Sequence, residues 1–435
     1  MSIQVDLFSP QADPYPMYAL LREKAPVYRI EPHGYWAVSR YEDVLFVTKE
    51  HHLFSSETGI ERMRPPHVSD ELWSQLDILR TRNVVNSDPP DHTRLRRLVS
   101  GAFTPKAIAD LEARVRQITE ELIDAMLTKE QVDIVADFAI PLPVTVIAEM
   151  LGIDPARRLD FKRWSDDLLE IANVVRKRMD SSRIDAIVQS RKELVDHIEE
   201  LIGERRRAPR EDLISALVRS EAEEGKLTPQ EVLSMVIILL IAGNETTTNL
   251  ISSGTHLLLD HPEALAALRA DPSLIPGFLE ETLRFETPAP MLFRLTKAEV
   301  TLAGVTIPKD QFVMPLLAAA NRDPAHFADP DRFDIRRDSR GHVAFGYGIH
   351  FCVGAPLSRL EGRVAFEALL RRLPAFSRVN AQPEWSFATS MRALGSLPVR
   401  FERPASEGAD SAEPRGGRSP RLEAPEERDL SIQGV

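Results

Sequence analysis

Cysteine is almost absent from this chain, which has one such residue among 435. A single thiol cannot form an internal disulfide framework, and it is compatible with a reducing compartment. One sulfur also cannot make a structural zinc site, because that site needs four ligands.

The apolar fraction of 43% is enough for a sizeable core. On length alone the chain could form one large domain or two to three small ones.

Long apolar runs and excess positive charge are also lacking. The longest apolar run, Met235 to Ala242, is far shorter than a membrane span. Residues 1–10 lack a basic start followed by an apolar core, so we expect no signal peptide. The net charge of -12 argues against a general surface for nucleic acid or anionic membranes. These absences predict a cytoplasmic protein with neither partner.

Helical spacing of apolar residues covers most of the chain, so we expect a mainly α fold with small β-sheets, an α+β class. The expected helices cover residues 41–48, 92 onward, 105–127, 136–151, 155–175, 183–207, 228–260 and 355–373. The expected strands lie within residues 35–38, 132–135 and 295–317. Between residues 51 and 88 the periodicity weakens, which indicates an irregular loop. Residues 404–435 have almost no apolar side chains and should form a flexible tail.

The lone cysteine lies in a glycine-rich loop, Phe345 to Gly354, which reads F-G-Y-G-I-H-F-C-V-G. Glycine lets a backbone pass close to a flat body and supplies positive-φ turns. Pro356 suits the first turn of a following helix, whose N-terminus would favour a thiolate at Cys352. An iron held by four porphyrin nitrogens needs one such axial ligand. The alternative is a buried cysteine that acts as a small apolar residue.

The longest helical pattern begins at Thr228 with a capping threonine, a proline and an acid, and runs to about Asp260. Its first half is wholly apolar, which is typical of a helix buried on every side. The polar run A-G-N-E-T-T (242–247) follows in mid-helix and would be costly without partners. Thr246 can bond back to the Ala242 carbonyl, bend the helix and leave room for a small ligand. Bending alone is the alternative.

Two charged pairs have helical spacing. His92 and Arg96 stand four residues apart after the turn D-P-P-D, which would cap their helix, so both could hold one carboxylate. Glu281 and Arg284 stand three residues apart. Each pair by itself is more often a solvated helix face or a surface ion pair.

Taken in chain order, these motifs resemble those of the cytochrome P450 family. F-x-x-G-x-H-x-C-x-G resembles its haem-binding loop, D-P-P-D-H-T-R-L-R-R a propionate-binding segment, and A-G-x-E-T-T its oxygen-activating acid and alcohol pair. Pro356 and Ser358 differ from the family's commonest following segment, of the type Ala-(Leu)-Ala-Arg. The resemblance implies the P450 fold, a triangular helical prism within one domain, residues 1–403. Haem b would lie between the long central helix and the helix after the cysteine loop.

The resemblance also implies roles for single residues. Cys352 would be the axial thiolate, Glu245 would relay protons, and Thr246 would hold activated dioxygen. The other expected cofactor contacts are His92, Arg96, Arg294, Phe345, Gly346, His350 and Gly354. The expected substrate contacts are Ile238, Ile241, Ala242, Pro290, Met291 and Leu292, for the last three of which sheet core is an equal alternative. A buried structural network would join Glu281, Arg284 and Arg332.

The implied activity is a haem-dependent monooxygenase that inserts one oxygen atom of O2 into a C–H or C=C bond. The substrate would be an apolar small molecule such as a fatty acid, terpenoid, steroid or polyketide. The sequence has no phosphate loop, Rossmann fingerprint or other flavin site, so a ferredoxin or flavodoxin would deliver electrons. Its expected docking patch consists of Arg94, Arg97, Arg359 and Arg363. A peroxide-driven peroxygenase and a non-catalytic haem-binding sensor are alternatives, and both leave the Glu245–Thr246 pair unexplained.

Overall fold

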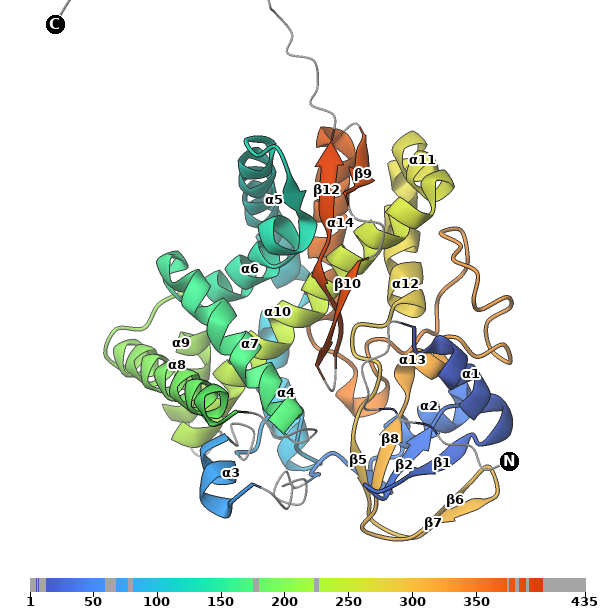
Figure 1. Cartoon of the computed structure of the whole chain (residues 1–435). Coiled ribbons are helices and arrows are strands. Elements are labelled where there is room, and N and C mark those ends of the chain that lie inside the picture. Colours follow the sequence, from blue (N-terminus) through green and yellow to red (C-terminus); the bar gives the residue numbers. More distant parts are fainter. Residues whose placement is uncertain are drawn as a thin grey trace, which may run out of the picture.

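The computed structural model describes residues 5, 7, 13–58, 68–76, 81–174, 180–222, 227–373, 375–379, 383–388 and 391–401. The expected tail, residues 404–435, and the end of the expected domain lie outside this part of the chain. The mainly α architecture with small sheets is confirmed (Figure 1).

The described helices follow one another along the whole chain. They are α1 (Tyr15–Lys24), α2 (Tyr41–Lys49), α3 (Asp70–Leu76), α4 (Asp91–Ser100), α5 (Pro105–Leu127), α6 (Pro141–Leu151), α7 (Arg158–Val174), α8 (Ser181–Arg207), α9 (Leu213–Ala222), α10 (Pro229–Asp260), α11 (Pro262–Ala270), α12 (Ile275–Phe285), α13 (Leu317–Ala320) and α14 (Ala355–Arg372). The short helix α3 lies in the stretch expected to be irregular, so that expectation was incomplete.

The strands form one larger sheet and three small ones. They are β1 (Val27–Ile30), β2 (Tyr35–Val38), β3 (Phe54–Ser55), β4 (Val132–Asp133), β5 (Arg294–Thr296), β6 (Val300–Leu302), β7 (Val305–Ile307), β8 (Phe312–Pro315), β9 (Phe376–Arg378), β10 (Glu384–Ala388), β11 (Met391–Ser396) and β12 (Pro398–Phe401). The larger sheet has the order β1-β2-β8-β5-β3, in which β2 and β8 pair in parallel. Figure 1 shows it beside α1 and α2, away from α7 and α8.

One expected strand is shorter than predicted. The V-D-I-V pattern at residues 132–135 pairs only over β4 and then continues as a π-helical turn, Val135–Ala139. The Asp133 carboxylate accepts a hydrogen bond from Val135 N at 2.9 Å, and Asp137 accepts one from Asp133 N at 3.0 Å. These local side-chain bonds replace the ladder bonds that a longer strand would need.

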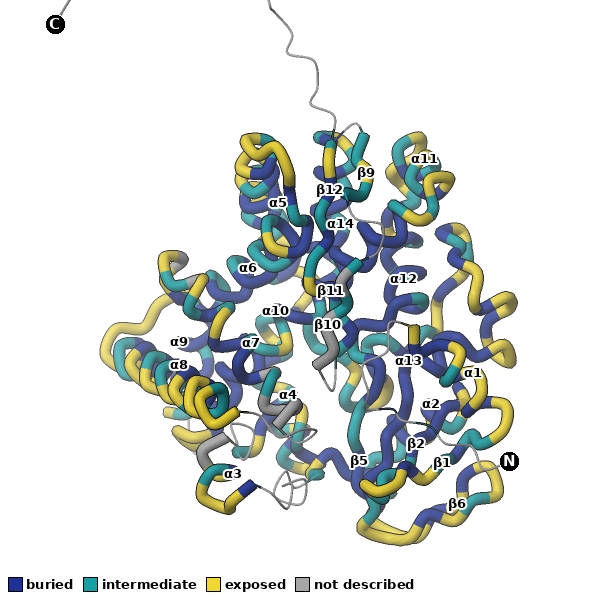
Figure 2. Tube along the Cα trace, in the orientation of Figure 1, coloured by how far each residue is buried: buried dark blue, intermediate teal, exposed yellow. Residues whose placement is uncertain are grey.

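Helix α10 crosses the middle of the molecule (Figure 1). It begins with the predicted capping box, in which Thr228 and Glu231 bond each other's backbone N–H. The helix is long and apolar enough to cross a membrane, but 78% of its most apolar window is buried inside the protein. Figure 2 shows this contrast with α8, which is exposed along its outer side. Helix α10 is therefore the core around which the other helices pack.

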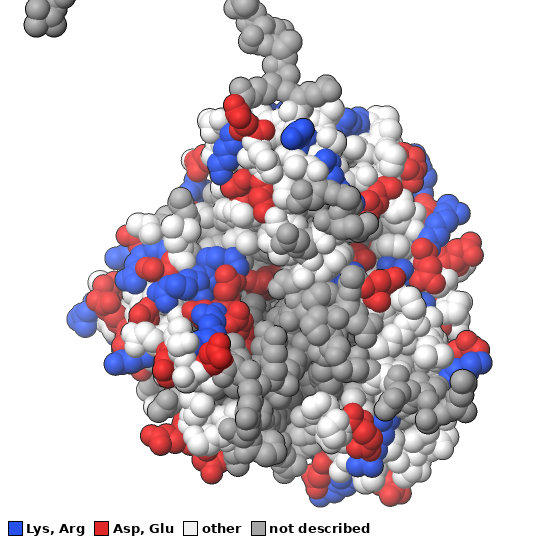
Figure 3. Space-filling model, in the orientation of Figure 1, with Lys and Arg blue, Asp and Glu red and all other residues white. Residues whose placement is uncertain are grey.

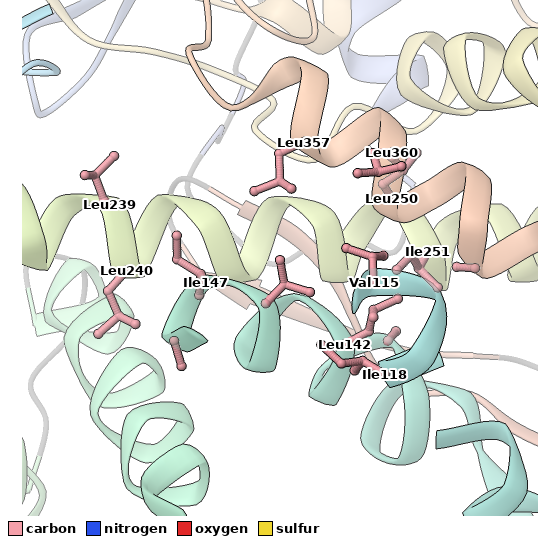
Figure 4. Close-up of a cluster of buried hydrophobic side chains, with 14 of the residues drawn as sticks. Val115, Ile118, Leu142, Ile147, Leu239, Leu240, Leu250, Ile251, Leu357 and Leu360 are labelled. Atoms are coloured by element: carbon pink, nitrogen blue, oxygen red, sulfur yellow. The ribbon is translucent and has the colours of Figure 1, made fainter. Parts of the chain in front are cut away.

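Apolar side chains hold α10 between α6 and α14 (Figure 4). Leu142 and Ile147 come from α6, and Leu357 and Leu360 come from α14. At Gly254 a Cβ would lie only 2.7 Å from Phe366 Cζ, so glycine is required for the close approach of α10 and α14. These contacts fix the position of the mid-helix polar cluster relative to the cysteine loop that precedes α14.

A buried ion pair supports the backbone before the cysteine loop. Glu281 and Arg284 of α12 are both 0% exposed and are bidentate, with both N–O distances at 2.7 Å. Arg284 Nη1 also donates to the carbonyls of Asn321 and Pro330 at 2.9 and 2.8 Å. Glu281 accepts from Ser339 Oγ at 2.7 Å. The pair therefore joins α12 to the loop that leads from α13 to the cysteine.

The expectation that the Arg332 side chain joins this network was wrong. Its side chain is 69% exposed and pairs with Asp334. Only the Arg332 carbonyl turns inward, where it accepts from Arg284 Nη2 at 3.4 Å. Arg337 takes the expected place, with its Nε 3.4 Å from Glu281 Oε1. The reason is that Arg284 requires carbonyl acceptors from this turn, which leaves the Arg332 side chain pointing outward.

This network gives a test of stability. Arg284→Ala removes one partner of a fully buried ion pair, so we expect the free energy of unfolding to fall by about 3–5 kcal/mol. Arg332→Ala is the matched control, for which we expect a change within about 0.5 kcal/mol, because its side chain is exposed. Chemical denaturation of both variants measures the difference, and equal effects would contradict the assignment of the network.

Candidate active site

The cysteine loop is a tight turn that depends on its glycines. Gly346 and Gly348 have φ of +70° and +73°. A Cβ at Gly348 would lie 3.1 Å from Thr48 O, so the loop can lie against the end of α2 only with glycine there. Cys352 N donates to Phe345 O at 2.9 Å and closes the loop. The sulfur is thus held at a fixed point just before α14.

Burial raises the pKa of the Cys352 thiol. The N–H groups of Gly354 and Ala355 and the charges of Arg96 and Arg359 oppose this shift. The helix N-terminus therefore favours a thiolate as expected, but burial outweighs it. A metal cation in contact with the sulfur would supply the stabilisation that the buried thiolate lacks.

Four cationic or potentially cationic side chains gather beside this loop, namely His92, Arg96, Arg294 and His350. The ring centroids of His92 and His350 are 4.2 Å apart. Burial and neighbouring positive charge lower the pKa of His92 to about 4 and that of His350 to about 3. Burial also lowers the pKa of Arg294 to about 10, and the negative charge of Asp88 opposes this shift. Such a cluster is costly unless an anion enters it.

The donor set fits a haem. His92 Nε2 is buried and has no hydrogen-bond partner within the described residues. A haem would bring two carboxylates to these donors and an iron to the single thiol. The same part of the chain contains no group of three or more His, Cys, Asp or Glu side chains that could hold a metal ion alone. The site therefore suits an iron that arrives with its own equatorial ligands.

Asp88 does not cap α4, contrary to the expectation from D-P-P-D. The N-cap residue is Pro90, which makes no side-chain capping bond. The Asp88 carboxylate instead accepts from Ser55 Oγ at 2.7 Å and Ser56 N at 2.9 Å, and it pairs with Lys297 at 3.2 Å. Asp88 thereby ties the start of α4 to β3, because its buried carboxylate is stabilised by two hydrogen-bond donors and the charge of Lys297.

The acid and alcohol of α10 have different environments. Thr246 Oγ1 donates to Ala242 O at 3.0 Å, as the sequence predicts. Glu245 is buried and lies against α7, with its Oε1 3.5 Å from Lys162 Nζ. Burial raises the pKa of Glu245, Lys162 lowers it, and Asp166 raises it. Lys162 also pairs with Asp166. Sequence reasoning missed both α7 residues, because no local pattern links them to α10.

The residues expected to contact substrate differ in how far they are buried. Ile241 is half-buried and Ala242 is exposed, although both lie in the middle of an otherwise buried helix. Ile238 and Pro290 are buried. Leu292 Cδ1 lies 4.0 Å from where a Cβ of Gly346 would be, beside the cysteine loop. Met291 packs in the apolar cluster of the larger sheet, in keeping with the sheet-core alternative.

Three of the four arginines of the expected basic patch are ion-paired within the chain. The shortest N–O distances are 2.6 Å for Arg94–Glu231, 2.7 Å for Arg359–Glu280 and 2.7 Å for Arg363–Glu112. Arg97 is exposed. Acids of neighbouring helices therefore neutralise three of the four arginines, and docking of an electron donor at this face stays a prediction. Figure 3 likewise shows charges of both signs side by side over α7 and α8.

Comparisons with known proteins agree with this geometry. The family model "Cytochrome P450" matches residues 67–399. The chain is 41% identical over 401 residues to 6-deoxyerythronolide B hydroxylase of Saccharopolyspora erythraea, covering 90% of this chain and 96% of the relative.

Two solved structures are similar over nearly the whole chain. Cytochrome P450 CYP109Q5 from Chondromyces apiculatus has a TM-score of 0.81 and 44% identity, covering 92% of this chain and 99% of that one. The myxobacterial cytochrome P450 CYP267B1, in complex with myristic acid, has a TM-score of 0.81, 38% identity and the same coverage. A buried lone thiol, its cationic neighbours, the fold and these matches agree, and the chain belongs to the cytochrome P450 family.

Proposed function

We propose that this protein is a haem-thiolate monooxygenase that uses Cys352 as the axial ligand and an apolar small molecule as the substrate. The observation that carries the proposal is the single thiol of Cys352, with the basic side chains of His92, Arg96, Arg294 and His350 gathered beside its loop, next to a core helix that contains an acid and alcohol pair. A peroxygenase or a sensor needs the same haem but not the same pair.

The chain's own residues would hold and orient the haem. Arg96, Arg294, His92 and His350 would bind its two propionates and neutralise charges that are otherwise costly to bury. Phe345 lies under the Arg359 guanidinium at 4.7 Å and would shield the sulfur side of the loop. When bound, the haem supplies the redox chemistry, and a thiolate ligand favours cleavage of the O–O bond.

Glu245 and Thr246 would take part in proton delivery. Burial raises the pKa of Glu245, so this side chain keeps its proton to a higher pH than an exposed glutamate does. Lys162 and Asp166 of α7 lie between Glu245 and solvent, since Asp166 is 47% exposed and pairs with Lys162. They would pass protons inward to Glu245. The Thr246 hydroxyl, which donates to Ala242 O, would accept a hydrogen bond at Oγ1 and so position the proton donor of the site without taking up the proton itself.

The substrate would be an apolar molecule of the fatty acid, terpenoid, steroid or polyketide classes. Ile241 and Ala242 offer an apolar accessible face in the centre of α10, and Leu292 lies beside the cysteine loop. One relative is named for 6-deoxyerythronolide B, and one similar structure contains myristic acid, which supports the apolar class. Electrons would come from a separate ferredoxin or flavodoxin.

The cofactor can be tested directly. Purified protein grown with ample haem should be coloured, and its reduced carbon-monoxide complex should show the absorption signature of thiolate ligation. Cys352→His keeps an axial ligand but should lose that signature, because imidazole replaces the thiolate. The proposal would be contradicted by a colourless wild-type protein, or by a thiolate absorption signature that persists in Cys352→His.

The alcohol of the pair gives a second test. Thr246→Ala should lower the product formed per electron pair by about tenfold or more, because proton delivery loses its positioned hydroxyl. Thr255→Ala is the matched control, since Thr255 makes the same back-bond, to Ile251 O at 2.9 Å. Turnover with O2 and with hydrogen peroxide measures both variants. Peroxide turnover that exceeds O2 turnover, with an inert Thr246→Ala, would favour the peroxygenase instead.

The environment of Glu245 predicts a pH effect. Lys162→Met removes the positive charge that lowers the pKa of Glu245, so that pKa should rise further. The carboxylate then exists only at higher pH, and the acidic limb of product formation should move upward by about one pH unit. Lys129→Met is the control, because Lys129 is exposed and pairs with Asp137. An unmoved acidic limb in Lys162→Met would contradict the contact's role.

A further inference from the structure

Glu280 of α12 is a carboxylate that joins the two ends of the cysteine loop. Its Oε1 and Oε2 accept hydrogen bonds from Nε and Nη2 of Arg359 on α14, at 2.7 and 2.8 Å. Its Oε2 also lies 3.1 Å from Nε2 of His342, which stands just before the loop. Since α14 follows the loop and His342 precedes it, one acidic side chain holds both flanks of the cysteine.

The imidazole of His342 connects Glu280 to the backbone of this loop. Its Nδ1 accepts a hydrogen bond from Ala344 N at 3.1 Å, so a neutral ring carries its proton on Nε2 and donates it to Glu280. The next residue is Phe345, whose carbonyl accepts from Cys352 N at 2.9 Å. Hydrogen bonds and short backbone segments therefore lead from Glu280 to the cysteine itself.

The guanidinium of Arg359 places a positive charge behind the cysteine loop. It lies over the ring of Phe345, 4.7 Å from the ring centroid. Burial raises the pKa of the Cys352 thiol, and the charges of Arg96 and Arg359 oppose this shift, so both charges reach the sulfur. A haem propionate would neutralise Arg96. Arg359 would therefore still act on the sulfur after a haem is bound.

Glu280 carries the opposite charge and stays ionised. Burial raises the pKa of Glu280, but hydrogen bonds from Arg359 and His342 outweigh burial and hold that pKa at about 2. The side chains of Arg359 and Glu280 are 39% and 26% exposed, so solvent screens both charges without cancelling them. The negative charge of Glu280 therefore offsets part of the positive charge that Arg359 brings to the sulfur.

Holding helices together does not by itself explain this pair. Glu281, the neighbour of Glu280, already ties α12 to the loop before the cysteine through the buried pair with Arg284. The pair of Arg363 with Glu112 joins α14 to α5 with the same N–O distance of 2.7 Å, but one turn farther from the cysteine. A charge that lies closer to the sulfur acts on it more strongly.

We propose that Glu280 is the positioning residue for Arg359, and that this charge pair tunes how easily a haem bound to Cys352 is reduced. The inference rests on the monooxygenase function proposed above. Reduction adds one electron from the donor protein to the bound haem, and it neither breaks a bond nor moves a proton at Cys352. Positive charge beside the sulfur favours the reduced form, and the negative charge of Glu280 limits this effect.

The reduction potential of the haem-loaded protein, titrated with dithionite and redox dyes, tests this inference without any turnover. Glu280→Gln should raise the potential and Arg359→Met should lower it. Each shift should change the one-electron equilibrium constant by about 3- to 10-fold, where tenfold corresponds to about 59 mV. Arg359→Lys keeps the charge and should stay close to the wild type. Glu112→Gln is the matched control, with a much smaller shift, because its partner Arg363 lies farther from the cysteine.

The double variant Glu280→Gln/Arg359→Met separates an effect of charge from an effect of loop structure. Two opposite charge effects should cancel, so its potential should return toward that of the wild type, and the shifts of both single variants should shrink at high salt. Loosening of the loop would instead shift both single variants in one direction and add in the double variant. That result overturns the inference, and so do single variants whose potentials equal that of the wild type.

The carbon-monoxide spectrum keeps this inference apart from the proposed function. Every variant should retain the absorption signature of thiolate ligation, because Cys352 itself is unchanged. A single variant that loses the signature shows that the pair holds the loop in place, which overturns the inference. A wild type that binds no haem, or that lacks the signature, overturns the proposed function.

Discussion

Helix α10 is buried for most of its length. Its polar side chains therefore form hydrogen bonds with the elements that pack against it. An unpaired polar group in such a place costs several kcal/mol, on the order of 2–7. Thr248 Oγ1 therefore donates to Ala139 O at 3.0 Å, and Asn244 lies 3.4 Å from Ser165 Oγ. The polar side chains of this part of α10 thus bond to the π-helical turn before α6, to α7 and to α14.

This arrangement separates the two buried acids near the mid-helix polar run of α10. Glu245 points to α7, where Lys162 and Asp166 connect it to the surface. Glu361 approaches the same turn from α14, through Thr247, and is closed to solvent. Burial raises the pKa of both carboxyl groups, but a lysine counteracts the effect only at Glu245.

On the opposite side of the site, a buried ion pair supports the backbone, and costly basic side chains are buried next to it. The buried Glu281–Arg284 pair holds the loop that leads to the cysteine, and Asn321 extends it by accepting from Val343 N at 2.7 Å. Against this frame lie Arg294 and three other potential cations, which burial makes costly. The frame keeps them together, and an anionic cofactor is the natural counterpart. Stability and cofactor binding are thus separate tasks of neighbouring residues.

The sequence by itself determined the elements and the chemistry that each motif can perform. The capping box at Thr228, the helix at Pro105–Leu127 and the back-bond of Thr246 follow from local spacing, because their partners are at most four residues away. Family motifs added the expected fold and the set of site residues. Local patterns could not separate Arg332 from Arg337 beside Glu281, because only the path of the turn decides which side chain points inward.

Tertiary structure alone decided the contacts between elements. Lys162 meets Glu245 across 83 residues, and Ser358 meets Thr247 across 111, distances in sequence over which no periodicity carries information. It also decided that acids neutralise the expected arginine patch and that Asp88 binds β3 instead of capping α4. The physical reason is common to all of these cases. Charge and burial depend on which surfaces pack together, and packing is settled only when the whole chain has folded.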